Sequence, residues 1–418
     1  MKNMDSRLDI CMWWTLKWTI FYSNIFIPGD DFFLLRVMFF AEFDNPPSRL
    51  GRNSLKWAKY EDREIIPLWV ADMDFKSPPS VLEQAMDSSE HGNFGYGRPP
   101  AQLIDRILER SEKLYNWRID PSWIVWLPGM VCALNVTCRS LLDQSSQAII
   151  QTPIYPPFLS ASKNFDLPLT KVPLLLKDNR FTIDFKALEN LSTSPGDLFM
   201  LCHPHNPVGT LFRENELRDL IEWLVQRELY LCSDEIHCDL ILEKELKHLP
   251  PASLDGRILS KSITLMAPSK TFNIAGFGCS FAVISEPSLR AKFKKAMRGI
   301  VPDPPAMGFL LADAAYSGGE QWRLDLIDYL KENRDLAMDR LGSLKGLVPY
   351  SPEATYLLWI DARSLPVDNP HLYFEENGVG LSDGKDFDAP GFLRLNLGCS
   401  RKLLVEAIDR MQVACDKL

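Results

Sequence analysis

The chain carries three short motifs that decide its fold: HPHNPVG at residues 203–209, SDEIH at residues 233–237 and PSKTFN at residues 268–273. Each motif follows a short apolar run of the kind that forms a buried strand. The central polar residues of the motifs are Asn206, Asp234 and Lys270. If the strands run parallel, their carboxyl ends meet at one edge of a sheet, so we expect these three side chains to converge there.

An amine, a carboxylate and an amide at one site are what pyridoxal 5′-phosphate (PLP) requires from a protein. Lys270 is the candidate for the Schiff base and for moving the substrate's Cα proton, which requires a lowered pKa. Asp234 is the candidate for holding the pyridine nitrogen protonated, and Asn206 for the ring oxygen O3′. His237 could reach O3′ or pack beside Asp234. Each residue alone has an ordinary alternative, such as a surface charge, a helix cap or a turn, so the combination carries the prediction.

The rest of the cofactor has further candidate partners. Tyr155, in the segment TPIYPPF, could stack on the ring, although it could also be an ordinary interfacial tyrosine. The helix start at Gly129, Met130 and Val131 offers backbone N–H groups for the phosphate. Ser269, beside the lysine, adds a hydroxyl. The sequence therefore predicts both a ring-binding and a phosphate-binding part of the site.

Arg394 lies in the apolar segment GFLRLN at residues 391–396. An arginine in such a strand is costly unless its charge is paired. Its planar guanidinium suits the α-carboxylate of an amino acid. We therefore expect Arg394 to hold a small-molecule amino-acid substrate.

Composition excludes several other classes of protein. The net charge of −9 disfavours nucleic acid and anionic membranes as main partners. Nine cysteines are scattered without the spacing of a metal site, so we predict no bound metal. Several of them lie in apolar runs, which favours a reducing compartment, the cytoplasm.

Hydrophobic patterning predicts an α/β fold with a largely parallel sheet. Strands are expected at residues 148–150, 198–202, 229–232, 263–266 and 281–284. Helical stripes are expected at residues 103–114, 131–141 and 217–224. A long helix over residues 321–344, strands at 355–360 and 392–397 and a terminal helix from Arg401 indicate a second, smaller domain. We expect a large PLP-binding domain over residues 91–319 and a small domain from residues 51–90 and 320–418.

The first 50 residues form an N-terminal extension with no clear place in this plan. The stretch CMWWTLKWTIFYSNIFI at residues 11–27 is aromatic-rich, but it is shorter than the roughly 20 apolar residues that span a bilayer. It also lacks the basic start and the cleavage site of a secretory signal. An arm on a partner subunit or an upstream extension is favoured over an interfacial anchor.

These motifs resemble the fold-type I PLP-dependent enzymes, the class I/II aminotransferase superfamily. Further stretches resemble its cystathionine β-lyase, or carbon–sulfur lyase, branch. The stretches are WVADMDF at 69–75, NFGY at 93–96, SDEIHCD at 233–239, SKTFN at 269–273 and FLRLNLGCSR at 392–401. The resemblance runs from about residue 54 to the C-terminus.

The resemblance implies a homodimer with active sites at the subunit interface. It implies a large domain with a mostly parallel mixed sheet flanked by helices, plus a smaller α/β domain. It also implies roles for individual residues: Lys270 as the Schiff-base lysine, Asp234 on the pyridinium, Asn206 and His237 on O3′, Tyr155 on the ring, Tyr96 on the phosphate of the neighbouring subunit's cofactor and Arg394 on the α-carboxylate. Two features depart from the family pattern. Ala267 stands where many relatives have a phosphate-binding serine or threonine, and residues 381–390 match only loosely.

The function implied by the resemblance is a PLP-dependent carbon–sulfur β-lyase. Such an enzyme cleaves a sulfur-bearing L-amino acid to pyruvate, ammonia and a thiol. The alternative is a class I/II aminotransferase, which uses the same lysine, aspartate and arginine but passes the amino group to a 2-oxo acid. A third hypothesis is a non-catalytic protein that keeps the fold and binds a partner. The intact set of Lys270, Asp234, Asn206 and Arg394 argues against it.

Overall fold

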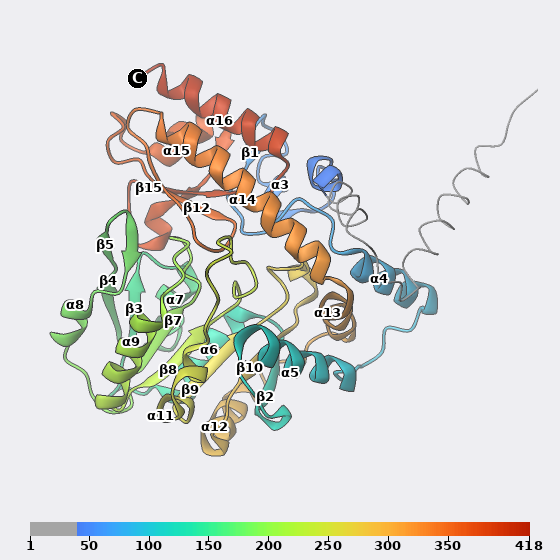
Figure 1. Ribbon diagram of the computed structural model, residues 1–418, viewed down its shortest axis with the longest axis vertical. Helices are drawn as coiled ribbons and strands as arrows, with labels where there is room; N and C mark the ends of the chain where they lie inside the picture. Colours follow the sequence, from blue (N-terminus) through green and yellow to red (C-terminus); the bar gives the residue numbers. More distant parts are fainter. Residues whose placement is uncertain (1–39) are drawn as a thin grey trace, which may run out of the picture.

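The computed structural model describes residues 40–418 (Figure 1). Most of the predicted N-terminal extension, including its aromatic stretch at 11–27, lies outside the described residues. Within residues 40–50, Phe43 is buried and its ring packs against Phe75 and Tyr329 at centroid distances of 4.9 and 5.3 Å. At least this part of the predicted extension therefore belongs to the folded core.

A seven-stranded sheet forms the centre of the molecule. Its strands, from one edge to the other, are β2 (Ile124–Leu127), β10 (Ser280–Val283), β9 (Ser262–Met266), β8 (Tyr230–Asp234), β7 (Leu198–Cys202), β3 (Ala148–Thr152) and β4 (Leu169–Pro173). β10 is antiparallel to both neighbours, while β9, β8, β7, β3 and β4 run parallel. This is the mostly parallel mixed sheet that the sequence predicts.

The strand predictions differ from the structure in detail. All five predicted runs correspond to strands, and β7 has the predicted bounds. β8 extends to Asp234, so this carboxylate ends the strand instead of following it. The edge strands β2 and β4 were not predicted. In β4, only Val172 is buried, so the apolar signal is weak.

Helices cover both faces of this sheet (Figure 1). α6 (Met130–Leu141) packs on the face that carries Ile150 and Met200, and α9 (Glu214–Gln226) packs on the face that carries Phe199. The predicted stripe of α9 is buried throughout, but Val131 of α6 is exposed, which corrects the predicted stripe there. The other helices of this part are α4 (Pro79–His91), α5 (Ala101–Tyr115), α7 (Pro156–Ser160), α8 (Phe185–Glu189), α10 (Pro251–Leu254), α11 (Gly256–Leu259), α12 (Pro287–Met297) and α13 (Ala306–Gly318).

A second, antiparallel sheet contains strands β11 (Val348–Tyr350), β12 (Leu357–Asp361), β15 (Phe392–Asn396) and β14 (Ser382–Asp383). Figure 1 shows it beneath α14 (Glu320–Gly342) and α16 (Arg401–Cys415), at the positions where the sequence predicts the long and the terminal helix. α15 (Pro370–Glu376) lies beside it. Strand β1 (Ile66–Pro67) pairs with β13 (Val379–Gly380), which ties residues before the large sheet to residues after it. The short α3 (Leu55–Ala58) and the hairpin of β5 (Leu175–Lys177) and β6 (Arg180–Thr182) complete the fold.

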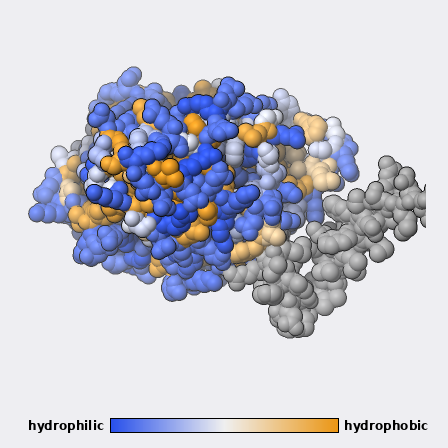
Figure 2. Space-filling model, turned by 90° about the horizontal axis from the view of Figure 1, so that it is seen from above, coloured by the Kyte–Doolittle hydropathy of each residue, from blue (hydrophilic) through white to orange (hydrophobic). Residues whose placement is uncertain are grey.

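The surface in the view of Figure 2 is largely hydrophilic, with apolar residues scattered over it. Across residues 40–418, no helix combines the length and the apolar character that crossing a bilayer requires.

Candidate active site

Three neighbouring strands bring the three motifs together. β7, β8 and β9 lie side by side and parallel, and Cys202 pairs with Asp234, which pairs with Leu265. The chain leaves β7 toward Asn206 and leaves β9 toward Lys270 at the same edge of the sheet. The structure therefore gathers the predicted amide, carboxylate and amine where parallel strands end.

Lys270 is half-buried, and its amine is held by a backbone carbonyl. Its Nζ donates a hydrogen bond of 2.6 Å to the carbonyl oxygen of Ala71. Burial, together with the positive charge of Arg394, lowers the pKa of the amine to about 8. A far larger fraction of this amine than of an ordinary lysine is therefore neutral near physiological pH, as a nucleophile or a base requires.

Asp234 is a buried carboxylate with little to neutralise it. It is 2% exposed, and its Oδ1 accepts a hydrogen bond of 3.1 Å from the backbone N–H of Ile236. Within residues 40–418 no cationic side chain forms an ion pair with it. Burial raises the pKa of the Asp234 carboxyl to about 7. A cationic N–H donor placed here would stabilise the ionised form and reverse that shift.

Arg394 is also buried, and all its partners are neutral. Its Nη1 donates to Oδ1 of Asn206 at 2.9 Å, and its Nη2 donates to the carbonyl of Trp69 at 2.9 Å and to Oγ of Ser382 at 3.2 Å. The ring of Phe387 lies 4.6 Å from the guanidinium carbon. The described chain supplies no carboxylate for this charge, and burial lowers the pKa of Arg394 to about 10. An anionic ligand would provide the missing charge.

Tyr155 and His237 lie among these groups. The backbone N–H of Tyr155 donates to the carbonyl of Asn206 at 3.0 Å, which fixes the two motifs together. Burial raises the pKa of the Tyr155 phenol, and the charge of Asp234 adds to this. Burial lowers the pKa of His237 to about 3, so its imidazole is neutral at physiological pH.

The residues that are predicted to bind the phosphate differ in how exposed they are. Gly129 precedes the first turn of α6 without a side-chain cap, so N–H groups of that turn remain available to an anion. Met130 is buried, Ser269 is half-buried, and Val131 is 45% exposed. Tyr96 is fully exposed, in the segment between α4 and α5. Its side chain therefore does not pack among the buried groups of its own chain.

Residues 69–75 form a segment, here called the strap, whose role the sequence did not reveal. Asn396 donates to the carbonyls of Val70 and Asp72, both at 2.6 Å. Asn273 donates to the carbonyls of Met73 and Phe75 at 3.0 and 2.8 Å. Asn396 lies two residues after Arg394 in β15, so the alternation of a strand places both on the same face. That alternation was a usable signal for Asn396.

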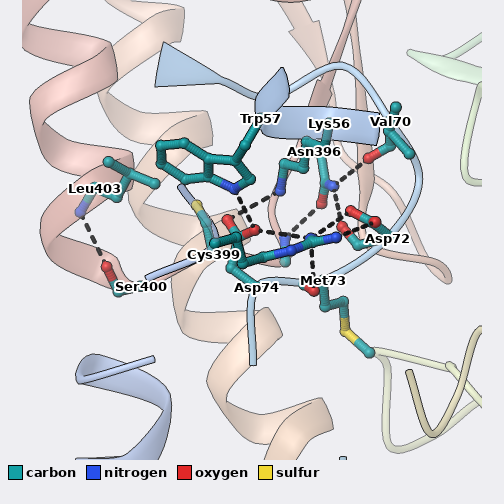
Figure 3. A network of polar contacts seen from close by, with 12 residues as sticks. Lys56, Trp57, Val70, Asp72, Met73, Asp74, Asn396, Cys399, Ser400 and Leu403 are labelled. Atoms are coloured by element: carbon teal, nitrogen blue, oxygen red, sulfur yellow. Dashed lines mark hydrogen bonds and ion pairs between the residues drawn. The ribbon is translucent and has the colours of Figure 1, made fainter. Parts of the chain in front are cut away.

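A network of polar contacts also fastens the strap through its aspartates (Figure 3). Asp74 forms an ion pair of 3.0 Å with the buried Lys56 and accepts a hydrogen bond of 3.0 Å from the indole of Trp57. Arg49 contacts both Asp72 and Asp74, at 2.8 and 3.1 Å. The segment that presents the Ala71 carbonyl to Lys270 is therefore held rigidly.

Comparisons with known proteins agree with this geometry. The family model for aminotransferase class I and II matches residues 63–411. Cystathionine beta-lyase PatB of Bacillus subtilis (strain 168) is 34% identical over 384 residues, covering 89% of this chain and 99% of PatB. Among solved structures, OvoB superposes with a TM-score of 0.87 and 42% identity, covering 89% of this chain and 98% of OvoB. Cystalysin from Treponema denticola, which contains PLP, superposes with a TM-score of 0.84 and 31% identity, covering 90% of this chain and 98% of cystalysin. The chain thus has the fold-type I architecture and belongs to the class I and II aminotransferase family.

Proposed function

We propose that this chain is a PLP-dependent carbon–sulfur β-lyase. Its substrate would be an L-amino acid with sulfur on Cβ, which reacts with water to give a thiol, pyruvate and ammonia. The observation that carries the proposal is that two features occur at one site. Lys270 has a lowered pKa, and the buried Arg394 lacks a carboxylate partner in the described chain. The near full-length match to a cystathionine β-lyase favours elimination over other PLP chemistry.

The residues present fit PLP. Asp234 would accept the hydrogen bond of the ring nitrogen, and its raised pKa would fall when that cation binds. Asn206 uses its Oδ1 for Arg394, which leaves the amide N–H₂ for the ring oxygen. Neutral His237 can add a second contact there, and Tyr155 can cover the ring. The start of α6 at Gly129, Met130 and Val131 and the hydroxyl of Ser269 would hold the phosphate.

In the reaction, bound PLP supplies the electron sink that makes loss of the substrate's Cα proton feasible. Arg394 would hold the substrate α-carboxylate and thereby orient the Cα–H bond. Lys270 would take the Cα proton as general base. The sulfur would leave Cβ with the electrons of the C–S bond and gain a proton as the thiol. Water would then hydrolyse the remaining enamine to pyruvate and ammonia.

The test is pyruvate release from L-cystathionine by cofactor-loaded protein with no keto acid present. Sustained release over many turnovers supports the lyase. The alternative is an aminotransferase, the activity for which the matched family is named. That reading predicts one turnover at most without a 2-oxo acid, and transfer of the amino group when one is added. Purified protein that takes up no PLP would support the non-catalytic hypothesis.

We also propose a homodimer in which Tyr96 completes the phosphate site of the neighbouring subunit. The support is the exposure of Tyr96 and of the nearby Phe94, which is 67% exposed. A hollow of about 1040 Å³ lies there, between α4, residues 93–97 and residues 302–307.

Mixing two inactive variants tests this arrangement. Lys270→Ala and Tyr96→Ala subunits, once exchanged, would form hybrids in which one site has both residues intact. Activity should return in the mixture if the partner donates Tyr96. No recovery, with subunit exchange confirmed by mass, would contradict a shared site.

Two further proposals concern organisation and location. The division into residues 91–319 and residues 51–90 with 320–418 is supported by the two separate sheets and by the pairing of β1 with β13. Limited proteolysis should cut first near residues 90 and 320 if the division is right.

A cytoplasmic location is supported by the free thiols of the described cysteines. Fractionation of the source cells tests it.

A further inference from the structure

A buried tyrosine shares its hydrogen-bond acceptor with Lys270. Tyr356 lies immediately before β12 and is wholly buried. Its hydroxyl donates a hydrogen bond of 2.9 Å to the carbonyl oxygen of Ala71, the same atom that accepts the 2.6 Å bond from Nζ of Lys270. Its ring meets the imidazole of His237 edge-on, at a centroid distance of 5.9 Å. No role proposed above uses Tyr356.

The Ala71 carbonyl has little freedom to turn away from these two donors. On one side, Asn396 holds the carbonyl of Val70, and on the other it holds the carbonyl of Asp72. Arg394 holds the carbonyl of Trp69. A carbonyl oxygen has two lone pairs, and here one donor uses each of them. The amine of Lys270 and the phenol of Tyr356 are therefore held next to each other at the Ala71 carbonyl oxygen.

Several charged groups act on the Lys270 amine. The charge of Arg394 favours the neutral amine, while the charges of Asp72 and Asp234 favour the ammonium. Arg49 forms an ion pair with Asp72. The neutral His237 also lies within electrostatic range of Lys270. Tyr356 differs from all of these because its hydroxyl donates to the Ala71 carbonyl oxygen, the same atom to which the amine donates its hydrogen bond.

The phenol of Tyr356 acts as a permanent donor. Burial raises the pKa of Tyr356 far above its ordinary value, so the hydroxyl keeps its proton over the working range of an enzyme. Its partly positive hydrogen points at the Ala71 carbonyl oxygen. Without this hydroxyl, the ammonium of Lys270 would not share that acceptor with Tyr356. A charged donor gains more from such an oxygen than a neutral one. Competition at Ala71 therefore weakens the hold on the ammonium more than the hold on the neutral amine.

We propose that Tyr356 is a positioning residue for Lys270: its hydroxyl fixes the place where the free amine rests on the Ala71 carbonyl and weakens the amine's hold on its proton. The inference rests on the proposed function, in which Lys270 leaves the cofactor and acts as the base. It concerns the interval when the amine is free.

The test compares Tyr356→Phe with Tyr350→Phe in the cofactor-loaded enzyme. Tyr350, in β11, is a matched control because it is also buried, at 6% exposure, but packs against Phe181 of β6. Without the Tyr356 hydroxyl, the acid limb of the kcat profile should move up by about 0.5–1 pH unit, the scale of one hydrogen bond. At pH 7, kcat should fall by about 3–10-fold while KM changes less than about twofold. The control should move neither.

A second readout does not depend on activity. In the full chain stripped of cofactor, the pH midpoint for reductive methylation of Lys270, followed by peptide mass spectrometry, should rise by the same amount in Tyr356→Phe. Tyr356→Met, which also lacks the hydroxyl, should give the same direction and guards against an effect of the ring. An unchanged or lowered midpoint would overturn the inference. The methylation midpoint decides this question even if PLP does not link to Lys270, a result that would remove the proposed function instead.

Discussion

Two lysines contact the strap, Lys56 through Asp74 and Lys270 through the Ala71 carbonyl, and their charges are treated differently. Lys56 is wholly buried and lies 3.0 Å from the carboxylate of Asp74, which also accepts bonds from Arg49 and Trp57 (Figure 3). Lys270 instead donates to a neutral carbonyl, and in the described chain it has no carboxylate within ion-pair distance. Its pKa is lowered to about 8 as a result of burial.

The contrast separates structural polar groups from functional ones. A buried charge is costly unless it is paired, and breaking a made pair leaves the partner uncompensated. The Asp74 network meets this requirement within the chain and so holds the strap in place. The described chain does not provide such a partner for Lys270, Asp234 or Arg394. A charged cofactor or substrate that binds there can supply the missing charge. The two regions should therefore respond to substitution in different measurements.

The largest expected effect is on turnover, in Lys270→Ala. We expect activity to fall at least ~10³-fold, because the residue that links the cofactor and moves the proton is lost. The visible absorption of the lysine-linked cofactor should disappear as well. Lys56→Met is the matched control, and it should lower stability while the surviving folded protein keeps its cofactor linkage. Retained lyase activity in Lys270→Ala would break the comparison.

The next effect is on stability, in Asp74→Ala. Removing this carboxylate leaves Lys56 buried without its counter-charge and should lower the free energy of unfolding by ~3–5 kcal/mol. Urea unfolding followed by fluorescence measures it. Combining Asp74→Ala with Lys56→Met should cost less than the sum of the two single changes, because neither charge of the Lys56–Asp74 pair is then left alone. Additive losses would show that the pair is not coupled.

A smaller effect is expected on substrate binding, in Arg394→Lys. The ammonium cannot reproduce the fork of the guanidinium, so KM for the amino acid should rise ~10–100-fold while PLP stays linked. Arg363→Lys serves as the control, since Arg363 is 60% exposed and pairs with Asp361 at the surface. A KM unchanged in Arg394→Lys would place the α-carboxylate elsewhere.

The sequence was informative where chemistry coincides with a strand end. Asn206, Asp234 and Lys270 could be placed together because parallel strands end at one edge of a sheet. Arg394 could be singled out because an arginine in an apolar strand needs a reason to be there. By contrast, the Ala71 carbonyl has no signal in the sequence, since every residue has one. The contact of Tyr356 depends on how the strap meets the second sheet, and a contribution from Tyr96 depends on a second chain.

The smallest effect concerns two aspartates of one motif, Asp234 and Asp239, which extend the comparison to carboxylates. Asp239 pairs with Arg110 at 3.0 Å and accepts a hydrogen bond from Tyr115, and the charge of Arg110 holds its pKa below the usual value although burial opposes this. Asp234 has no such cation, and burial raises its pKa to about 7.

The two shifts have opposite consequences for the stability of the cofactor-free protein. The folded pKa of Asp234 lies above its unfolded value of about 3.9, so its contribution to stability is present at low pH and is lost as pH rises through about 7. As pH rises from 5 to 8, the stability of Asp234→Asn relative to the parent should therefore increase by about 2–3 kcal/mol. The contribution of Asp239 is present above about pH 4 and is lost as pH falls through its lowered pKa, so Asp239→Asn should be less stable at neutral pH, with the deficit shrinking in acid. Urea unfolding at several pH values measures both variants. If PLP is added, the advantage of Asp234→Asn should disappear, because the ionised carboxylate then has its cation; an advantage that persists in the loaded protein would mean that Asp234 does not face the cofactor.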